Sequence, residues 1–155
     1  MPPVSIPVST YLLVSLVAGV VGAIAMYIVM RLLNVRNWAH GDMVAAVGSM
    51  ITKRRENSFA VGALVHLVVG VVFAFLYLLG FARIGFIHFP AAPIAGLFIG
   101  ALHGSAVAIA LVWVVSDQHP LQEFQRASLA VGVLHCIGHC VFGLVVGLVI
   151  ASWPI

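Results

Sequence analysis

The stretch that decides the fold is the last long apolar run of the chain, residues 127–151, which reads ASLAVGVLHCIGHCVFGLVVGLVIA. It contains no Asp, Glu, Lys or Arg. A helix rises about 1.5 Å per residue and the hydrocarbon core of a bilayer is about 30 Å thick, so about 20 such residues span it. Residues 10–33, 58–80 and 92–115 meet the same requirement, with Arg31 as the one charged residue inside them. The sequence therefore predicts four transmembrane helices.

The composition of the whole chain supports this interpretation. Of 155 residues, seven are Lys or Arg and four are Asp or Glu, and the mean hydropathy is +1.20. A soluble domain carries roughly a quarter charged residues, because its surface must face water. So few charges exclude a cytosolic enzyme, a disordered chain and a nucleic-acid-binding protein. We expect an all-α integral membrane protein, a four-helix transmembrane bundle.

The four spans form two helical hairpins in a single transmembrane domain, residues 1–155, because no linker separates them. A Gly-x3-His-x3-Gly pattern occupies residues 62–70 of the second span, and His-x3-His-x3-Gly-x3-Gly occupies residues 135–147 of the fourth. This internal sequence similarity predicts a duplicated hairpin whose copies run in parallel, unlike the inverted repeats of many transporters. Small residues at four-residue spacing let helices approach closely, so we expect these faces to point inward.

The first connection contains a further helical segment, residues 42–52, which reads DMVAAVGSMIT. Asp42 is a favourable N-cap residue, and the apolar side chains that follow fall largely on one face. Lys53, Arg54 and Arg55 come directly after it. The pattern indicates a short interfacial helix with its basic end near anionic lipid. A linker packed beneath the bundle is an equally good interpretation.

The distribution of basic residues predicts the orientation. Cytoplasmic connections of membrane proteins are enriched in Lys and Arg. Six of the seven basic residues flank or fill the first and third connections, namely Arg31, Arg36, Lys53, Arg54, Arg55 and Arg126, and only Arg83 lies in the second. We therefore expect a multi-pass protein of a bacterial inner (plasma) membrane with both termini outside.

Four of the seven histidines lie inside the predicted spans: His66, His103, His135 and His139. An ionisable side chain at membrane depth is costly and usually faces protein or a cavity. At about 1.5 Å per residue, His66 and His135 lie about 12 Å, and His139 about 18 Å, from the cytoplasmic side. His103 lies about 16 Å from the other side. We expect these side chains to form a cluster near the middle of the bundle.

Such a cluster has three possible functions. Neutral imidazole is a ligand for transition metals, and two His from different helices can hold haem b. In the first interpretation the cluster binds a transition metal ion or haem. In the second, the chain is a small transporter or channel subunit with a His-lined polar path. In the third, it is an accessory or scaffold subunit with a purely structural His network. The candidate cofactor or metal ligands are His66, His103, His135, His139, Cys136 and Cys140.

Other signals are weaker. Asp117 and His119 precede Pro120 at the end of the third span, where such a pair could bind a cation at an entrance but more often caps a helix or forms a turn. Paired carboxylates, an activated nucleophile and a phosphate-binding loop are absent from the sequence, so we expect no enzymatic activity. The expected partners are the lipid bilayer and either further copies of the chain or a larger membrane complex, with no nucleic acid.

Several short motifs resemble a family of small four-span bacterial inner-membrane proteins known as a domain of unknown function. They are DMVAAVGSM (residues 42–50), His66-x3-Gly70-x2-Phe73, Gly96-x3-Gly100-x2-His103-Gly104 and Gly138-His139-x2-Phe142-Gly143. The similarity extends from about Gly19 to Gly147. The resemblance implies that His66, His103 and His139 are the family-type positions, and that His135, Cys136 and Cys140 depart from the family pattern.

Overall fold

The computed structural model describes residues 6–35, 42–125 and 128–155. Ala127, at the start of the expected last span, lies outside these ranges, and so do Arg36 and Arg126. The elements are α1 (Val8–Val35), α2 (Met43–Thr52), α3 (Ser58–Ile84), α4 (Ala91–Ala110), a π-helical turn η1 (Leu111–Val115), α5 (Ser116–Gln118), a 3-10 turn η2 (Gln122–Phe124) and α6 (Leu129–Ser152). The prediction of an all-helical fold with four long apolar helices is confirmed.

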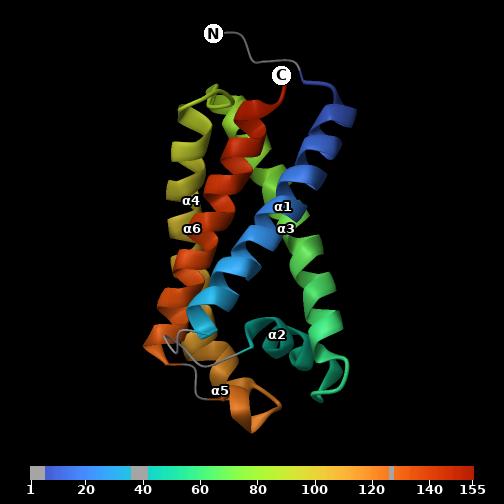
Figure 1. Cartoon of the computed structure of the whole chain (residues 1–155), viewed down its shortest axis with the longest axis vertical. Coiled ribbons are helices and arrows are strands. Elements are labelled where there is room, and N and C mark those ends of the chain that lie inside the picture. Colours follow the sequence, from blue (N-terminus) through green and yellow to red (C-terminus); the bar gives the residue numbers. More distant parts are fainter. Residues whose placement is uncertain (1–5, 36–41, 126–127) are drawn as a thin grey trace.

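The four long helices run between two ends of an elongated bundle (Figure 1). Both chain ends lie at one end, and α2 and α5 lie at the other. Each of α1, α3, α6 and the continuous α4–η1 segment is long and apolar enough to cross a membrane. Their outer faces are strongly apolar, with large exposed side chains such as Leu12, Leu64, Leu102 and Leu129.

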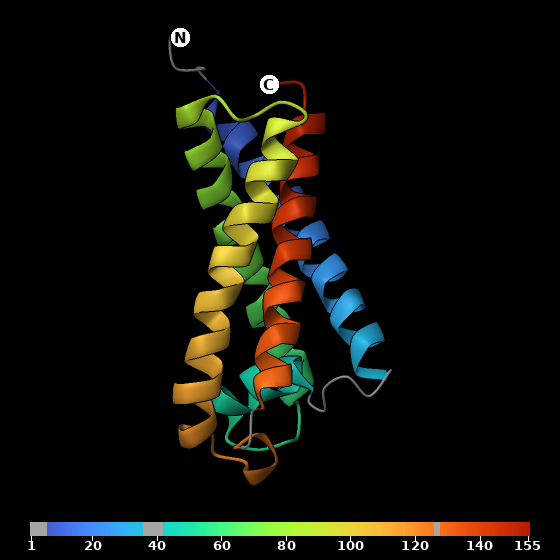
Figure 2. The same cartoon turned by 90° about the vertical axis from the view of Figure 1, so that its left-hand side faces the viewer.

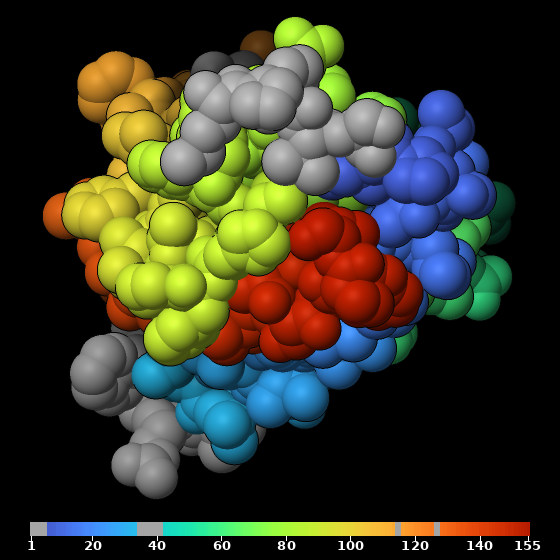
Figure 3. Space-filling view, turned by 90° about the horizontal axis from the view of Figure 1, so that it is seen from above, coloured from blue at the N-terminus to red at the C-terminus, as the bar shows by residue number. Residues whose placement is uncertain are grey.

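The long helices do not contact one another equally. α4 packs against α6 along most of its length, and α1 packs against both α6 and α3. Figure 2 shows α4 and α6 side by side, while α1 diverges from α6 toward the α2 end. Seen from the end that carries the termini, α6 lies between α1 and the α3–α4 connection (Figure 3). Few backbone contacts join α3 to α4, so the bundle is tight on one side and loose along the α3–α4 seam.

Glycines allow the tight contact between α4 and α6. A Cβ atom at Gly96 would overlap the carbonyl oxygen of Gly143, and one at Gly100 would overlap that of His139. At Gly147 it would overlap the backbone of Ala92. These backbones can approach so closely only because no side chain separates them. The prediction that the glycine-bearing faces point inward is confirmed.

The segment 42–52 forms a helix packed closely against α3. The Asp42 side chain accepts a hydrogen bond from the Ala45 N–H at 3.0 Å, which confirms the predicted N-cap. Gly48 and Gly62 face each other, and a Cβ atom on either would overlap backbone atoms of the partner helix. α2 is therefore a fixed part of the bundle rather than a loose connection.

The predicted duplication is not reflected in equal packing. α1 and α3 form one hairpin and α4 and α6 the other, as expected. Two equivalent copies would bring α3 against α4 as closely as α6 lies against α1. The α3–α4 contact is instead slight. The two hairpins are thus not interchangeable in the folded chain, and their difference is concentrated at the α3–α4 seam.

The glycine contacts lead to a stability prediction. We expect Gly62→Val to lower the free energy of unfolding by about 3 kcal/mol, because overpacking costs about 1–3 kcal/mol and here the clash is with backbone. Gly80→Ala is the control, since a Cβ atom there meets nothing within 4 Å. It should stabilise the helix by about 0.5–1 kcal/mol. Thermal or denaturant unfolding in detergent measures both, and equal stability of the two variants would contradict the account.

Candidate functional site

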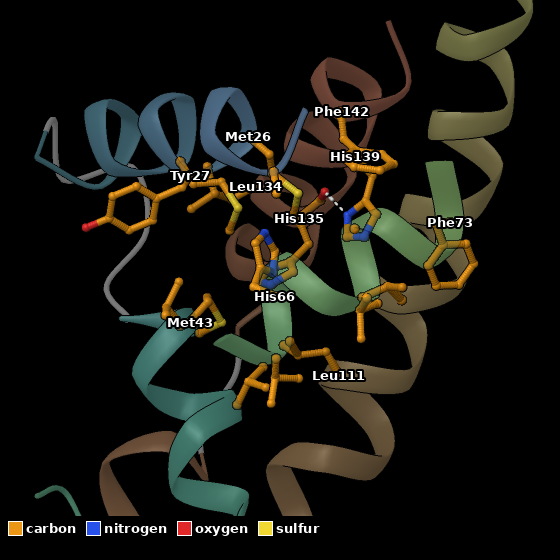
Figure 4. A pocket seen from close by; sticks show the side chains of 18 of the residues that line it. Met26, Tyr27, Met43, His66, Phe73, Leu111, Leu134, His135, His139 and Phe142 are labelled. Atoms are coloured by element: carbon orange, nitrogen blue, oxygen red, sulfur yellow. Dashed lines mark hydrogen bonds between the residues drawn. The ribbon is translucent and has the colours of Figure 1, made fainter. Parts of the chain in front are cut away.

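A cavity of about 360 Å³ lies inside the bundle, in the half nearer α2, since Met43, Val44 and Val47 of α2 line it. Helices α1, α2, α3 and α6 and the α4–η1 segment all contribute to its wall, and Figure 4 shows side chains from these elements converging on it. The lining is mostly apolar. Its polar lining residues are Tyr27, Arg31 and Asp42 together with the four histidines that the sequence singled out: His66, His103, His135 and His139. The expectation that they lie together is met by this shared pocket.

His135 and His139 present the same ring nitrogen to the cavity. Nδ1 of His135 donates to the Val131 carbonyl at 3.0 Å, and Nδ1 of His139 donates to the His135 carbonyl at 2.9 Å (Figure 4). A carbonyl oxygen can only accept, so each Nδ1 carries a proton. In a neutral ring, Nε2 is then an unprotonated acceptor. Within the described parts of the chain nothing hydrogen bonds to either Nε2 atom.

The other two imidazoles enter the pocket from different helices. His66 extends from α3, and its ring makes no hydrogen bond to any described residue. His103 of α4 lies against the ring of Phe73, with centroids 4.0 Å apart, and meets the His139 ring edge-on at 4.6 Å. Its Nδ1 lies 3.5 Å from the Tyr77 hydroxyl. His66 therefore has unused hydrogen-bonding capacity, whereas His103 is part of an aromatic contact between α3 and α4.

The candidate ligand set divides in two. In residues 6–35, 42–125 and 128–155, no group of three or more His, Cys, Asp or Glu side chains is arranged to hold a metal ion. Cys136 and Cys140 lie outside the pocket lining. Cys136 faces α4, with its sulfur 3.7 Å from the Ser105 hydroxyl and 3.8 Å from the Ala101 carbonyl. The four histidines thus share a pocket that the two cysteines do not enter.

Sequence reasoning missed most of the apolar wall. Its members include Met26 and Met30 from α1, Met43 from α2, Phe73 from α3 and Phe142 from α6. Phe73 and Phe142 fall within the family-like motifs, and that was the only signal for them. The methionines carry no pattern that distinguishes a pocket wall from ordinary core. Two charged side chains, Arg31 and Asp42, line the end of the pocket nearest α2.

α2 closes this end of the pocket and is anchored by His119. This side chain is only 2% exposed. Its Nε2 donates to the Ala46 carbonyl of α2 at 3.0 Å, while its Nδ1 accepts from the Leu121 N–H at 3.1 Å. The Ser49 hydroxyl lies 3.4 Å from the same Nε2. His119, expected to be a simple turn former, therefore connects α2 to the chain between α4 and α6.

Charged groups add a second, more exposed connection between the same segments. Arg55 lies 3.6 Å from the Asp42 carboxylate and 3.9 Å from that of Glu123. Its guanidinium also lies over the Phe124 ring, 5.5 Å from the centroid. Exposed ion pairs contribute only about 0–1 kcal/mol each, so the buried His119 contact is the stronger anchor.

This anchor can be tested directly. We expect His119→Phe to destabilise the α2 end by about 1–3 kcal/mol, because it removes two buried hydrogen bonds and leaves the Leu121 N–H without its partner. Hydrogen exchange of the α2 amides should accelerate, while α4 and α6 stay protected. His88→Phe, at an exposed position in the α3–α4 connection, is the matched control. Unchanged exchange in α2 would show that His119 does not hold it.

Comparison with known proteins gives no further identification. No family model, curated protein or solved structure matches this chain. The resemblance to the four-span bacterial family stays a prediction, and the site is interpreted from its own geometry.

Proposed function

We propose that this chain is a multi-pass membrane protein of a bacterial inner membrane, in which α1, α3, α4 and α6 each cross the bilayer. The length of these helices and their apolar outer faces support this assignment. Both termini lie at one end of the bundle, while Lys53, Arg54 and Arg55 follow α2 at the other. The positive-inside rule then places α2 on the cytoplasmic side and the termini outside.

Within that bundle, we propose that the histidine-lined pocket binds a lipid-soluble small molecule with a hydroxylated aromatic head, such as a quinol. The observation that carries this proposal is the pair of unprotonated Nε2 atoms that His135 and His139 present to an apolar cavity. Both residues are buried, but the protein does not fully enclose either Nε2 atom, and a polar atom that faces an apolar cavity costs free energy unless it is hydrogen-bonded. A ligand that donates hydrogen bonds would satisfy these two atoms.

The hydroxyl groups of the head follow from the tautomer. An unprotonated Nε2 atom accepts a hydrogen bond and cannot donate one, so it favours O–H groups over carbonyl oxygens. The reduced form of a quinone carries two hydroxyls, whereas the oxidised form carries two carbonyls. His135 and His139 therefore favour the reduced form.

The aromatic body of the ligand follows from the wall. Thioether sulfurs make favourable contacts with aromatic ring edges, and aromatic side chains add edge-to-face contacts. Met26, Met30 and Met43 surround the cavity together with Phe73 and Phe142. A volume of about 360 Å³ lies within the range of small-molecule pockets, about 300–1,000 Å³. A single substituted ring fits such a space.

Haem b is a second candidate, favoured by the same Nε2 atoms, since one imidazole suffices as an axial ligand. A metal ion held by protein side chains alone is less well supported, because three donors do not come together in the described residues. A Soret band in the purified protein would identify haem. Its absence, together with binding of a hydroquinone, would favour the first candidate.

The two remaining interpretations fit the geometry less well. A polar path through the bundle would have to pass the tightly buried apolar side chains beyond the pocket, which include Val14, Leu78, Phe81 and Val146. A purely structural histidine network would give His66 a hydrogen-bond partner, and it has none among residues 6–35, 42–125 and 128–155. Unpaired imidazole nitrogens that face one mostly apolar pocket instead fit a binding site.

The orientation is tested by single-cysteine variants in a Cys136→Ala, Cys140→Ala background. Ser152→Cys lies at the end of the bundle that carries the termini, and Arg54→Cys lies at the α2 end; both positions are exposed. A membrane-impermeant maleimide should label Ser152→Cys on intact cells and Arg54→Cys only after permeabilisation. The reverse pattern would contradict the orientation, and labelling of both on intact cells would contradict spanning.

The binding site is tested with trimethylhydroquinone, held reduced, and with trimethylbenzoquinone. In detergent we expect the hydroquinone to raise the unfolding temperature more than the quinone does. His135→Phe and His139→Phe should each weaken hydroquinone binding roughly two- to tenfold, because a neutral hydrogen bond contributes about 0.5–1.5 kcal/mol. Cys136→Ala, on the same helix but outside the pocket, should bind normally. Equal hydroquinone binding by the wild type and these three variants would contradict the assignment.

A further inference from the structure

An apolar groove runs along the α3–α4 seam, on the side of the histidine pocket away from α2. It is lined by Phe73, Leu76, Tyr77, Gly80, Phe81, Ile84, Ile99 and His103. Two of these residues, Phe73 and His103, also line the histidine pocket. The groove and the pocket are therefore neighbours that share one wall.

This shared wall consists of side chains. α3 and α4 make few backbone contacts, and they meet here through the Phe73 and His103 rings. One polar contact accompanies this aromatic pair: the Tyr77 hydroxyl lies 3.5 Å from His103 Nδ1. Side-chain rotations occur far more readily than helix movements. Rotation of the Phe73 and His103 side chains, rather than movement of α3 or α4, would join the pocket to the groove.

The chain itself leaves the groove unfilled. A Cβ atom at Gly80 meets nothing within 4 Å, in contrast to the glycines of the α4–α6 and α2–α3 contacts. Leu76 and Ile84, one turn to either side, are exposed. The surface is therefore apolar and concave at the centre of this part of α3.

The opposite end of the pocket has a different character. Arg31 and Asp42 line it, and α2 closes it through the His119 anchor. A long apolar chain leaving the pocket at that end would pass charged groups at the expected cytoplasmic surface. Through the α3–α4 seam it would contact apolar side chains and then lipid.

We propose that the α3–α4 groove holds the alkyl or isoprenyl tail of the ligand whose head occupies the histidine pocket. This inference rests on the proposed function of the pocket and specifies its ligand as a tailed hydroquinone. The molecule reaches the pocket sideways from the bilayer, between α3 and α4. The Phe73 and His103 side chains lie at the point where the head of the ligand joins its tail.

The test uses a hydroquinone with a ten-carbon tail that carries a diazirine at its end. After illumination of the protein in lipid nanodiscs, peptide mapping should find adducts on the groove side of α3, residues 76–84, and on Ile99. Excess untagged decylhydroquinone should remove them, which separates specific binding from general labelling by lipid-dissolved probe. Adducts on α2, or adducts that the competitor does not reduce, would overturn the inference.

Two variants refine the result. Gly80→Leu fills the groove without a backbone clash, and it should lower the specific adduct yield severalfold while tail-less trimethylhydroquinone binds as before. Leu102→Phe adds comparable bulk on an exposed face of α4 outside both the groove and the pocket, and it should change neither. Normal adduct yield in Gly80→Leu would overturn the tail site alone. Failure of both the tailed and the tail-less probe to bind the wild type would overturn the proposed function as well.

Discussion

Close contact between helix backbones at glycine is the constraint on which the rest of this structure depends. Between apolar helices in lipid there is no hydrophobic drive to associate, so packing at short range supplies much of the attraction. Gly96 and Gly100 give α4 that contact with α6, and Gly48 and Gly62 give it to α2 and α3. These two contacts make two firm pairs of helices. α1 joins them by packing against both α3 and α6.

The pocket forms where such contacts are missing. α3 and α4 carry no facing glycines at close range, and they meet through large rings instead. The space left between α1, α2, α3 and α4 is bordered by α6. Backbone carbonyls of α6 accept hydrogen bonds from His135 and His139 and so fix the orientation of both rings. The same arrangement thus creates the cavity and orients its polar groups. The tight α4–α6 contact borders the pocket directly, since His139 lines the pocket while its backbone meets Gly100 of α4.

Much of the fold could be predicted from sequence because its signals are local. Apolar runs and small-residue spacing located the helices and their inward faces, and helix rise predicted the similar heights of the four histidines that share the pocket. The site was harder because its signals are not local. His119 bonds to Ala46, 73 positions away in the chain, and nothing near Pro120 indicates it. Met26 and Met43 have the same pattern as core residues. Helical periodicity predicts that His135 and Cys136 lie on neighbouring faces of one helix, but it could not show that Cys136 would face α4 while His135 faces the pocket.

The central claim is that His135 and His139 direct unprotonated Nε2 atoms into an apolar pocket. Nitrogen-15 NMR of histidine-labelled protein in lipid bilayers measures this most directly, because protonated and unprotonated ring nitrogens have well-separated shifts. The account predicts two neutral rings with the proton on Nδ1, whose Nε2 signals move when trimethylhydroquinone is added. Protons on Nε2 in these rings, or on both nitrogens, would contradict it.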